Sequence, residues 1–450
     1  MWRQILALIL TAALTLQLPD LTRKSYLELL QLSPTLKFSE KDYDSAREKL
    51  EKDKESEQDR LEKAEDKLND QIKASRKQLD SLNKASSRDT ASQKDERQRL
   101  HCQILDLEGQ LRDTETERKQ GVPILFENRF AKLDLIRNWP TRKQEIERLI
   151  ATGQARNREY GDIDDIGIRI VGENQQDDIK TGEDAIREMK SLQLMPKEIQ
   201  DKELSRYIET LAATLAKNSD LKIPLKVTVL DTEEINAFAL PGAFLFVNLG
   251  LIDKAENESE LAGVLAHEIA HAAARHGAKL SKRATIANIF MQAAQVAAVI
   301  FTGGVAGIGT YYALQYGFYG LGMVLDLTLL GVSRDFEMEA DQLGVQYTWH
   351  AGIDPRGFVT FFDKMATKEG YVKSTSFFRT HPPFFDRIVT TFSELEFLPP
   401  KDQLRMDSSD FALAKKRVTV LMSKSKVEKE NKPTLHQVPE CPSPGEKTKK

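Results

Sequence analysis

The sequence predicts an α+β protein that is mainly helical, with a small β-sheet and a coiled-coil helical hairpin in front of it. Three observations lead to this fold class. A charged stretch at 40–120 repeats apolar residues at alternating intervals of three and four, as coiled coils do. Short stretches between 225 and 249 read as strands around a Pro-Gly turn. An apolar run of good helix formers at 258–276 then predicts a buried helix.

Composition limits the classes of function. Hydrophobic residues make up 40% and charged residues 30% of the 450 residues, and the net charge is −4. A basic field is therefore absent, and we expect no nucleic-acid partner. Two cysteines, Cys102 and Cys441, are too few for a cysteine-rich zinc module or a disulfide framework. A bridge between them and two free thiols both stay open.

The first residues indicate export. An uncharged run at 5–18 follows Arg3 and falls short of the about 20 residues that span a bilayer. Its length suits the apolar part of a signal peptide. We interpret 1–20 as a signal peptide or an uncleaved N-terminal anchor. Both predict an exported protein in the periplasm or cell envelope, and membrane association stays open.

The 40–120 stretch predicts a coiled-coil arm. Apolar positions form two series, and the same register puts Ser75 in the seam as a small polar gap. The series are Leu61, Ala64, Leu68, Ile72, Leu79 and Leu82, then Leu100, Ile104, Leu107 and Leu111. We expect two helices with a turn near 86–93, ended by Gly121-Val-Pro123. A solvated single helix or partly disordered arm is the alternative. Either form is an interaction or spacer element, so a coiled-coil partner is expected.

Helix-breaking residues and the spacing of apolar residues predict the other boundaries. We expect a helical connector at 121–182, a globular domain at 183–398, a helical segment at 399–426 and a disordered tail at 427–450. The aspartate-rich 161–167 stretch lacks the ligand spacing of a calcium loop and predicts an ordinary loop. The helix at 258–276 is expected to stop at Gly277.

Residues 284–325 carry no charge. Thr285, Asn288, Gln292 and Gln295 would form one polar stripe along a helix, which a lipid-facing span does not need. Glycines then divide the run. We expect two apolar helices that pack beside the site or touch a membrane surface, and a membrane hairpin is the alternative.

The chemistry centres on His267-Glu268-Ile-Ala-His271. On a helix, histidines four residues apart project from one face and can bind one zinc ion. The glutamate between them can reach a water on that metal. A carboxylate in an apolar helix is costly without such a task. The chain has only seven histidines, so composition alone does not explain the pair. We expect one Zn²⁺ per chain.

A catalytic zinc needs a third protein ligand. The candidates are His276, Glu337, Glu339 and His381. His276 lies nine residues after His267, roughly on the opposite face of a straight helix, and predicts a structural or ligand-supporting residue. Glu337 and Asp341 share a helix face, so Glu337 can bind zinc while Asp341 accepts the ring N–H of a ligand histidine. Glu339 points away from that face.

These motifs resemble the zinc metallopeptidase family of HtpX, the CAAX prenyl endopeptidases and BepA. The shared residues are His267-Glu-x-x-His271, Glu337-x-x-Ala-Asp341, Asn236-Ala-Phe-Ala-Leu-Pro-Gly242, Gly250-Leu-Ile, and Thr380-His381-Pro382 followed by Arg387. The resemblance covers about 183–395 and looks closest to the soluble periplasmic BepA-like branch. The coiled-coil arm and the lack of tetratricopeptide repeats after residue 400 depart from that branch.

The resemblance implies a zincin-like domain and an endopeptidase acting on unfolded or misassembled envelope proteins. Glu268 would be the general base. Phe244 and Phe246, on an edge strand, and Asn236 would contact substrate, with an ordinary core strand as the alternative for 244–247. His381 would approach the metal from a loop, as a resting-state cap or a catalytic residue, or be a plain loop histidine. Arg387 would orient a carboxylate or the oxyanion, or form a surface salt bridge. Two other functions stay open: a membrane-embedded protease, and a chaperone or scaffold that works through its coiled coil.

Overall fold

The computed structural model describes residues 17–84, 91–156, 158–191, 195–281, 333–367 and 386–430. These ranges are mainly helical and contain one three-stranded sheet, so the predicted fold class is confirmed. The helices before the sheet are α2 (Leu18–Leu21), α3 (Tyr26–Leu32), α4 (Glu40–Lys84), α5 (Ala91–Thr116), α6 (Val122–Ala151), α7 (Asp178–Ser191) and α8 (Lys202–Lys217). Those after it are α9 (Leu249–Lys254), α10 (Glu258–Ala273), α11 (His276–Ser281), α15 (Ser333–His350), α16 (Arg356–Thr367), α18 (Asp386–Phe397) and α19 (Ser409–Glu430).

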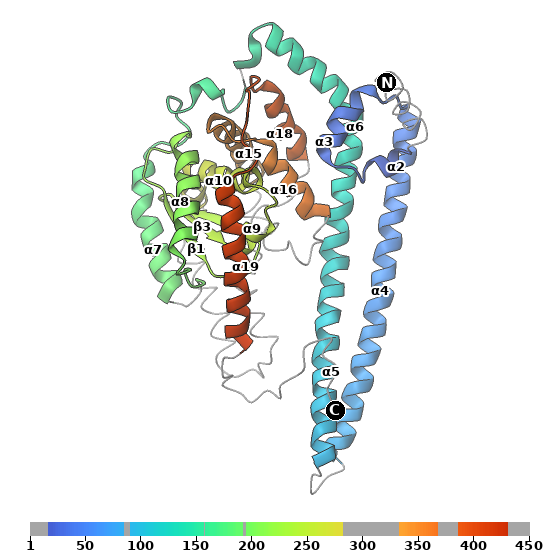
Figure 1. Cartoon of the computed structure of the whole chain (residues 1–450). Coiled ribbons are helices and arrows are strands. Elements are labelled where there is room, and N and C mark those ends of the chain that lie inside the picture. Colours follow the sequence, from blue (N-terminus) through green and yellow to red (C-terminus); the bar gives the residue numbers. More distant parts are fainter. Residues whose placement is uncertain are drawn as a thin grey trace.

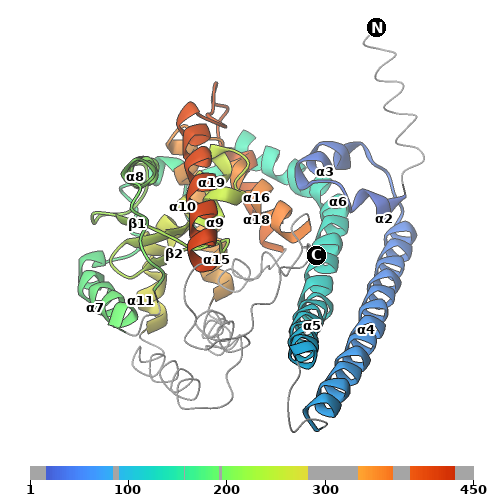
Figure 2. The same ribbon diagram turned by 60° about the horizontal axis from the view of Figure 1, so that its bottom comes forward.

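The predicted helical hairpin is present. Helices α4 and α5 lie side by side and stand beside the domain that holds the sheet (Figures 1 and 2). Leu61, Ile72 and Ser75 of α4 are buried, as are Leu100 and Ile104 of α5. The alternation of three and four therefore marks a packed seam, and the solvated single helix is wrong for this part of the chain. The turn was expected near 86–93; residues 91–93 already belong to α5, and residues 85–90 lie outside the described residues.

The arm does not end at Gly121-Val-Pro123. A π-turn, η2 (Glu117–Gly121), joins α5 to α6, and the chain stays helical to Ala151. Pro123 falls in the first turn of α6, directly after the π-turn. In the π-turn, Arg118 forms a bidentate pair with the buried Glu65 of α4, at 2.6 and 2.9 Å. Beyond this pair, helix α4 packs on α6 as well as on α5.

The folded core begins inside the segment assigned to the signal or anchor. Leu18 and Leu21 of α2 are 4% and 0% exposed and belong to the main core. Arg129 of α6 donates to the Pro19 carbonyl at 3.0 Å. A boundary at residue 20 would cut through this packing, so an N-terminal truncation should keep residues from 17 onward. Residues 1–16 lie outside the described residues.

The sheet has the order β1-β3-β2, with β1 (Lys226–Leu230), β2 (Ala237–Leu240) and β3 (Phe244–Asn248). β3 is central, parallel to β1 and antiparallel to β2. The predicted Pro241-Gly242 turn joins β2 to β3, and Gly242 has a φ of +83°. Alternate β3 side chains face opposite ways. Leu245 and Val247 enter the main core, which also holds apolar residues of α10.

Gly182 is explained by close packing and not by a domain boundary. It lies inside α7, and a Cβ there would come 1.9 Å from the Pro241 carbonyl oxygen. α7 therefore lies directly against the turn between β2 and β3. The boundary expected at 182–183 falls within this helix and does not mark a break in the fold.

Helix α10 is the centre of the domain and packs on α8, α15, α16 and β2. Glycines let its neighbours approach closely. A Cβ at Gly263 would lie 2.7 Å from the Phe358 backbone nitrogen on α16, and one at Gly344 of α15 would lie 3.0 Å from the His267 nitrogen. An added methyl group at Gly263 would force α10 and α16 apart. These close approaches bring α15 and α16 onto the His267 segment.

Helix α10 ends before the predicted stop. It finishes at Ala273, and α11 begins at His276, so Gly277 lies inside the second helix. Arg275, between them, has a φ of +59°. Such a left-handed residue breaks a helix and changes its direction.

Two other predictions fall partly or wholly outside the described ranges. The uncharged 284–325 stretch lies outside them. Helix α19 extends to Glu430, so the tail predicted as disordered from 427 is still helical at 427–430, and residues 431–450 lie outside the described residues. Within the described part of the chain, no helix is both long and apolar enough to span a bilayer.

Candidate metal centre

The structure brings His267, His271 and Glu337 together as a donor cluster. The two histidine Nε2 atoms are 3.0 Å apart. Glu337 Oε1 lies 3.3 Å from His271 Nε2, and Oε2 lies 3.5 Å from His267 Nε2. A tetrahedral zinc with bonds of 2.0–2.1 Å separates its ligand atoms by about 3.3 Å. Among the described residues, this is the one group of three His, Cys, Asp or Glu side chains placed to hold a metal. Two nitrogens and one oxygen at these separations fit zinc.

Asp341 lies behind His267. Its Oδ1 is 2.9 Å from His267 Nδ1, so the other ring nitrogen faces the cluster. Glu337 and Asp341 lie four residues apart on α15, so one helix face carries both the donor carboxylate and the carboxylate that contacts His267. A ring N–H held by a carboxylate fixes the tautomer of a ligand histidine.

Arg387 of α18 contacts both acidic residues. Its Nη1 is 2.7 Å from Glu337 Oε2, and its Nε is 2.6 Å from Asp341 Oδ2. Burial would raise the pKa of Asp341, but Arg387 and His267 outweigh it and hold the pKa below its usual value. Arg387 is itself 2% exposed, so the surface salt bridge is wrong. Its contacts are those of a residue that positions Glu337 and Asp341.

Glu268 faces the edge strand β2. Its Oε2 accepts a hydrogen bond from the Ala239 N–H at 3.1 Å. In the β2–β3 pairing the Asn236 carbonyl accepts from Asn248 N–H, so the N–H groups of Ala237 and Ala239 point to the outer edge of β2. The Glu268 carboxylate therefore lies at the outer edge of the sheet.

His276 reaches the cluster from the other side. Its Nδ1 is 2.8 Å from His271 Nδ1, and its Nε2 is 3.0 Å from Glu339 Oε2. Burial lowers the pKa of His276 to about 4, so the ring is neutral at pH 7. Glu339 is directed at His276 and not at the three donor atoms. The straight-helix expectation, which put His276 on the far face, fails because α10 breaks at Arg275.

Phe358 is a site residue that sequence reasoning missed. Its ring stacks on His267 with centroids 5.1 Å apart and an angle of 16° between the planes. Nothing in the sequence marks it, because the contact depends on how α16 crosses α10.

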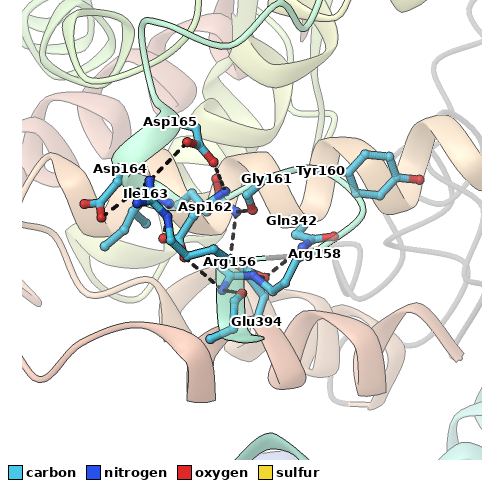
Figure 3. A network of polar contacts seen from close by, with 12 residues as sticks. Arg156, Arg158, Tyr160, Gly161, Asp162, Ile163, Asp164, Asp165, Gln342 and Glu394 are labelled. Carbon is cyan, nitrogen blue, oxygen red and sulfur yellow. Dashed lines mark hydrogen bonds and ion pairs between the residues drawn. The ribbon is translucent and has the colours of Figure 1, made fainter. Parts of the chain in front are cut away.

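Helix α15 is also held by a polar network that joins it to α18 and to the 156–165 stretch (Figure 3). Gln342 donates to Glu394 of α18 at 2.8 Å, and Arg158 pairs with the same carboxylate at 2.9 Å. In the 161–167 stretch, Asp165 accepts from the Asp162 N–H at 2.8 Å, and Asp162 pairs with Arg158. These aspartates stabilise a turn and carry no shared cation site. The network fixes α15, and with it Glu337, against α18.

The prediction that the 244–247 strand is an open edge for extended substrate is wrong. The 244–247 stretch belongs to the central strand β3, paired on both sides, so it has no open edge. Phe244 and Phe246 lie in a second cluster with Ile179 and Ile186 of α7, on the sheet face opposite α10. Asn236 is buried immediately before β2. His381 lies outside the described residues.

Comparison with known proteins agrees with this geometry. The model of peptidase family M48 matches residues 198–392, which contain all three donors and Glu268. The chain is 31% identical over 227 residues to a beta-barrel assembly-enhancing protease of Yersinia pestis, covering 49% of this chain and 44% of that protein. It is 33% identical over 210 residues to mitochondrial metalloendopeptidase OMA1 of Schizosaccharomyces pombe, covering 46% and 55%.

The chain spans about half the length of these two relatives. A third relative, metalloprotease YcaL of Escherichia coli, is 31% identical over 186 residues, which are 41% of this chain and 68% of that protein. The family model and this extensive match, together with the cluster of His267, His271 and Glu337, show that the chain belongs to peptidase family M48.

Proposed function

We propose that the protein is a zinc-dependent endopeptidase. The observation that carries this proposal is the set of donor atoms 3.0–3.5 Å apart on His267, His271 and Glu337, with Glu268 directly after His267 on α10. Two imidazoles and one carboxylate are a common catalytic zinc set, and such sites leave a position open for water or substrate.

A zinc ion held there would lower the pKa of the attacking water toward about 7 and polarise the scissile carbonyl. Glu268 then has the position of the general base: it takes the proton from that water and delivers it to the leaving amine. Asp341 and Arg387 keep His267 and Glu337 oriented throughout. The burial of His267 and Glu337, 2% and 3% exposed, limits the freedom of both side chains.

The outer edge of β2 is the best candidate to bind extended substrate. Among the described residues, no strand pairs with that edge, and the Ala239 N–H on it lies beside Glu268. Because Glu268 accepts from the Ala239 N–H, a peptide added there would pair with the other outward main-chain groups of β2, such as the Ala237 N–H, next to the general base. This role replaces the one first expected of Phe244 and Phe246.

The natural substrates we propose are unfolded or misassembled proteins of the cell envelope, reached by export. Support comes from the apolar N-terminal run and from relatives named for enhancing β-barrel assembly. Another relative is named as mitochondrial, so the family alone does not fix the compartment. The arm of α4 and α5 is available to bind a coiled-coil partner.

The third ligand is tested by Glu337→Gln. We expect zinc affinity to fall by more than the about 10- to 100-fold typical of residues that only support a ligand. Hydrolysis of casein should fall with it. The measurement is zinc content and casein cleavage of the purified chain from residue 17 onward.

Glu209→Gln, the same change at an exposed position of α8, is the matched control. It should keep full zinc content and activity. Normal zinc binding by Glu337→Gln would contradict the assignment of Glu337.

A further inference from the structure

We propose that His276, backed by Glu339, is a positioning residue that fixes His271 as a metal ligand. The inference rests on the proposed zinc function and extends it. In this arrangement both ligand histidines are tied to a carboxylate of α15. Asp341 holds His267 directly, and Glu339 holds His271 through the ring of His276.

The backbone departs from a regular helix in order to place His276. Arg275 has a φ of +59°, a left-handed conformation that residues other than glycine rarely adopt. Arg275 is held there by two bonds from its guanidinium to Asp178 of α7, at 2.7 and 2.6 Å. Because the chain turns at this residue, His276 meets His271, whereas in a straight helix it would point away.

The positions of the ring protons decide which histidine donates in the contact between His271 and His276. When His271 offers Nε2 to a metal, its Nδ1 carries the proton. The Nδ1 of His276, 2.8 Å away, must then be the acceptor, so its proton is on Nε2. That N–H is 3.0 Å from Glu339 Oε2, which accepts it. Each donor in the series has one acceptor, and the series holds His271 in its metal-binding tautomer.

Packing keeps the second ring in this orientation. The ring of His276 lies flat on Phe336 of α15, with centroids 4.2 Å apart and planes 9° apart. The residue is 2% exposed. Phe336 and Glu339 stand three residues apart on α15, the helix that also carries Glu337 and Asp341. One helix therefore contributes a donor and the supports of both histidines.

The test compares zinc affinity, measured by competition with a chelator, in His276→Phe and His276→Asn of the full chain. His276→Phe keeps a stacking ring and loses the acceptor, and we expect about 10- to 100-fold weaker binding. His276→Asn keeps an acceptor near the Nδ1 position and should recover part of the loss. Because Glu339 acts through His276, adding Glu339→Gln to His276→Phe should weaken binding no further.

His350→Phe, the same exchange at the exposed end of α15, is the matched control and should bind zinc normally. Thermal unfolding of each metal-free variant separates loss of fold from loss of binding. If His276→Phe binds zinc within about twofold of the wild type, the positioning role is wrong while the zinc site stands. If the wild-type chain binds no zinc, the proposed function falls and this inference with it.

Discussion

Replacing Glu268 with glutamine is expected to lower the rate of casein hydrolysis by about 10²- to 10⁴-fold while zinc stays bound. Glutamine has nearly the same size and keeps an oxygen that can accept from the Ala239 N–H, which now bonds Glu268 Oε2 at 3.1 Å. It cannot take a proton from water. The change therefore removes the general base and spares the three donors.

The measurement is the initial rate of casein cleavage together with zinc content, with Glu209→Gln as control. Hydrolysis that survives Glu268→Gln with zinc bound would contradict the general-base role. The same variant tests the scaffold alternative in cells. If it complements a deletion strain although cleavage is lost, the arm and not the peptidase site carries the cellular function.

Replacing Lys132 with methionine is expected to destabilise the fold by about 3–5 kcal/mol, the range for breaking a buried ion pair on one side. Lys132 of α6 is 1% exposed, and its Nζ lies 2.7 Å from Asp363 of α16. Asp363 also accepts from Asn128 at 3.4 Å and from the Tyr26 N–H at 3.3 Å. Without Lys132, its carboxylate would be buried without its cation.

Urea unfolding of Lys132→Met measures this effect. The double variant Lys132→Met/Asp363→Leu removes both charges and should recover most of the loss. Lys119→Met, at an exposed lysine in the arm, should change stability little. If Lys132→Met is as stable as the Lys119 control, this pair does not dock α6 on the domain.

The same pair connects α6 to the helix that contacts the metal centre. Asp363 lies on α16 together with Phe358, which stacks on His267. The next residue, Lys364, bonds Glu260 of α10 at 2.5 Å. Helix α16 therefore joins α6 on one side to α10 on the other.

The parts that could be predicted are those fixed by local spacing. His267 and His271 share a face because they are four residues apart on one helix, and so do Glu337 and Asp341. The seam of the arm follows its apolar alternation in the same way. The Pro241-Gly242 turn could be predicted because a glycine after a proline favours a turn, and few other residues adopt the φ of +83° found at Gly242.

The parts that could not be predicted depend on tertiary contacts. β3 reads equally well as an edge or a central strand, and its pairing with β1 decides between them. The break at Arg275 depends on Asp178, nearly a hundred residues earlier in the chain. Gly277, the predicted end of the helix, lies inside α11, after α10 has already ended at Ala273. The helical continuation past Pro123 likewise depends on a π-turn that no local pattern announces.

The central claim, that His267, His271 and Glu337 hold one catalytic zinc, is tested most directly by chelation and reconstitution. The purified chain from residue 17 onward is stripped of metal, and casein hydrolysis is followed as zinc is returned. We expect no cleavage by the stripped chain and recovery that saturates at one zinc per chain. Full hydrolysis by the stripped chain, or by His271→Phe without bound zinc, would contradict the claim.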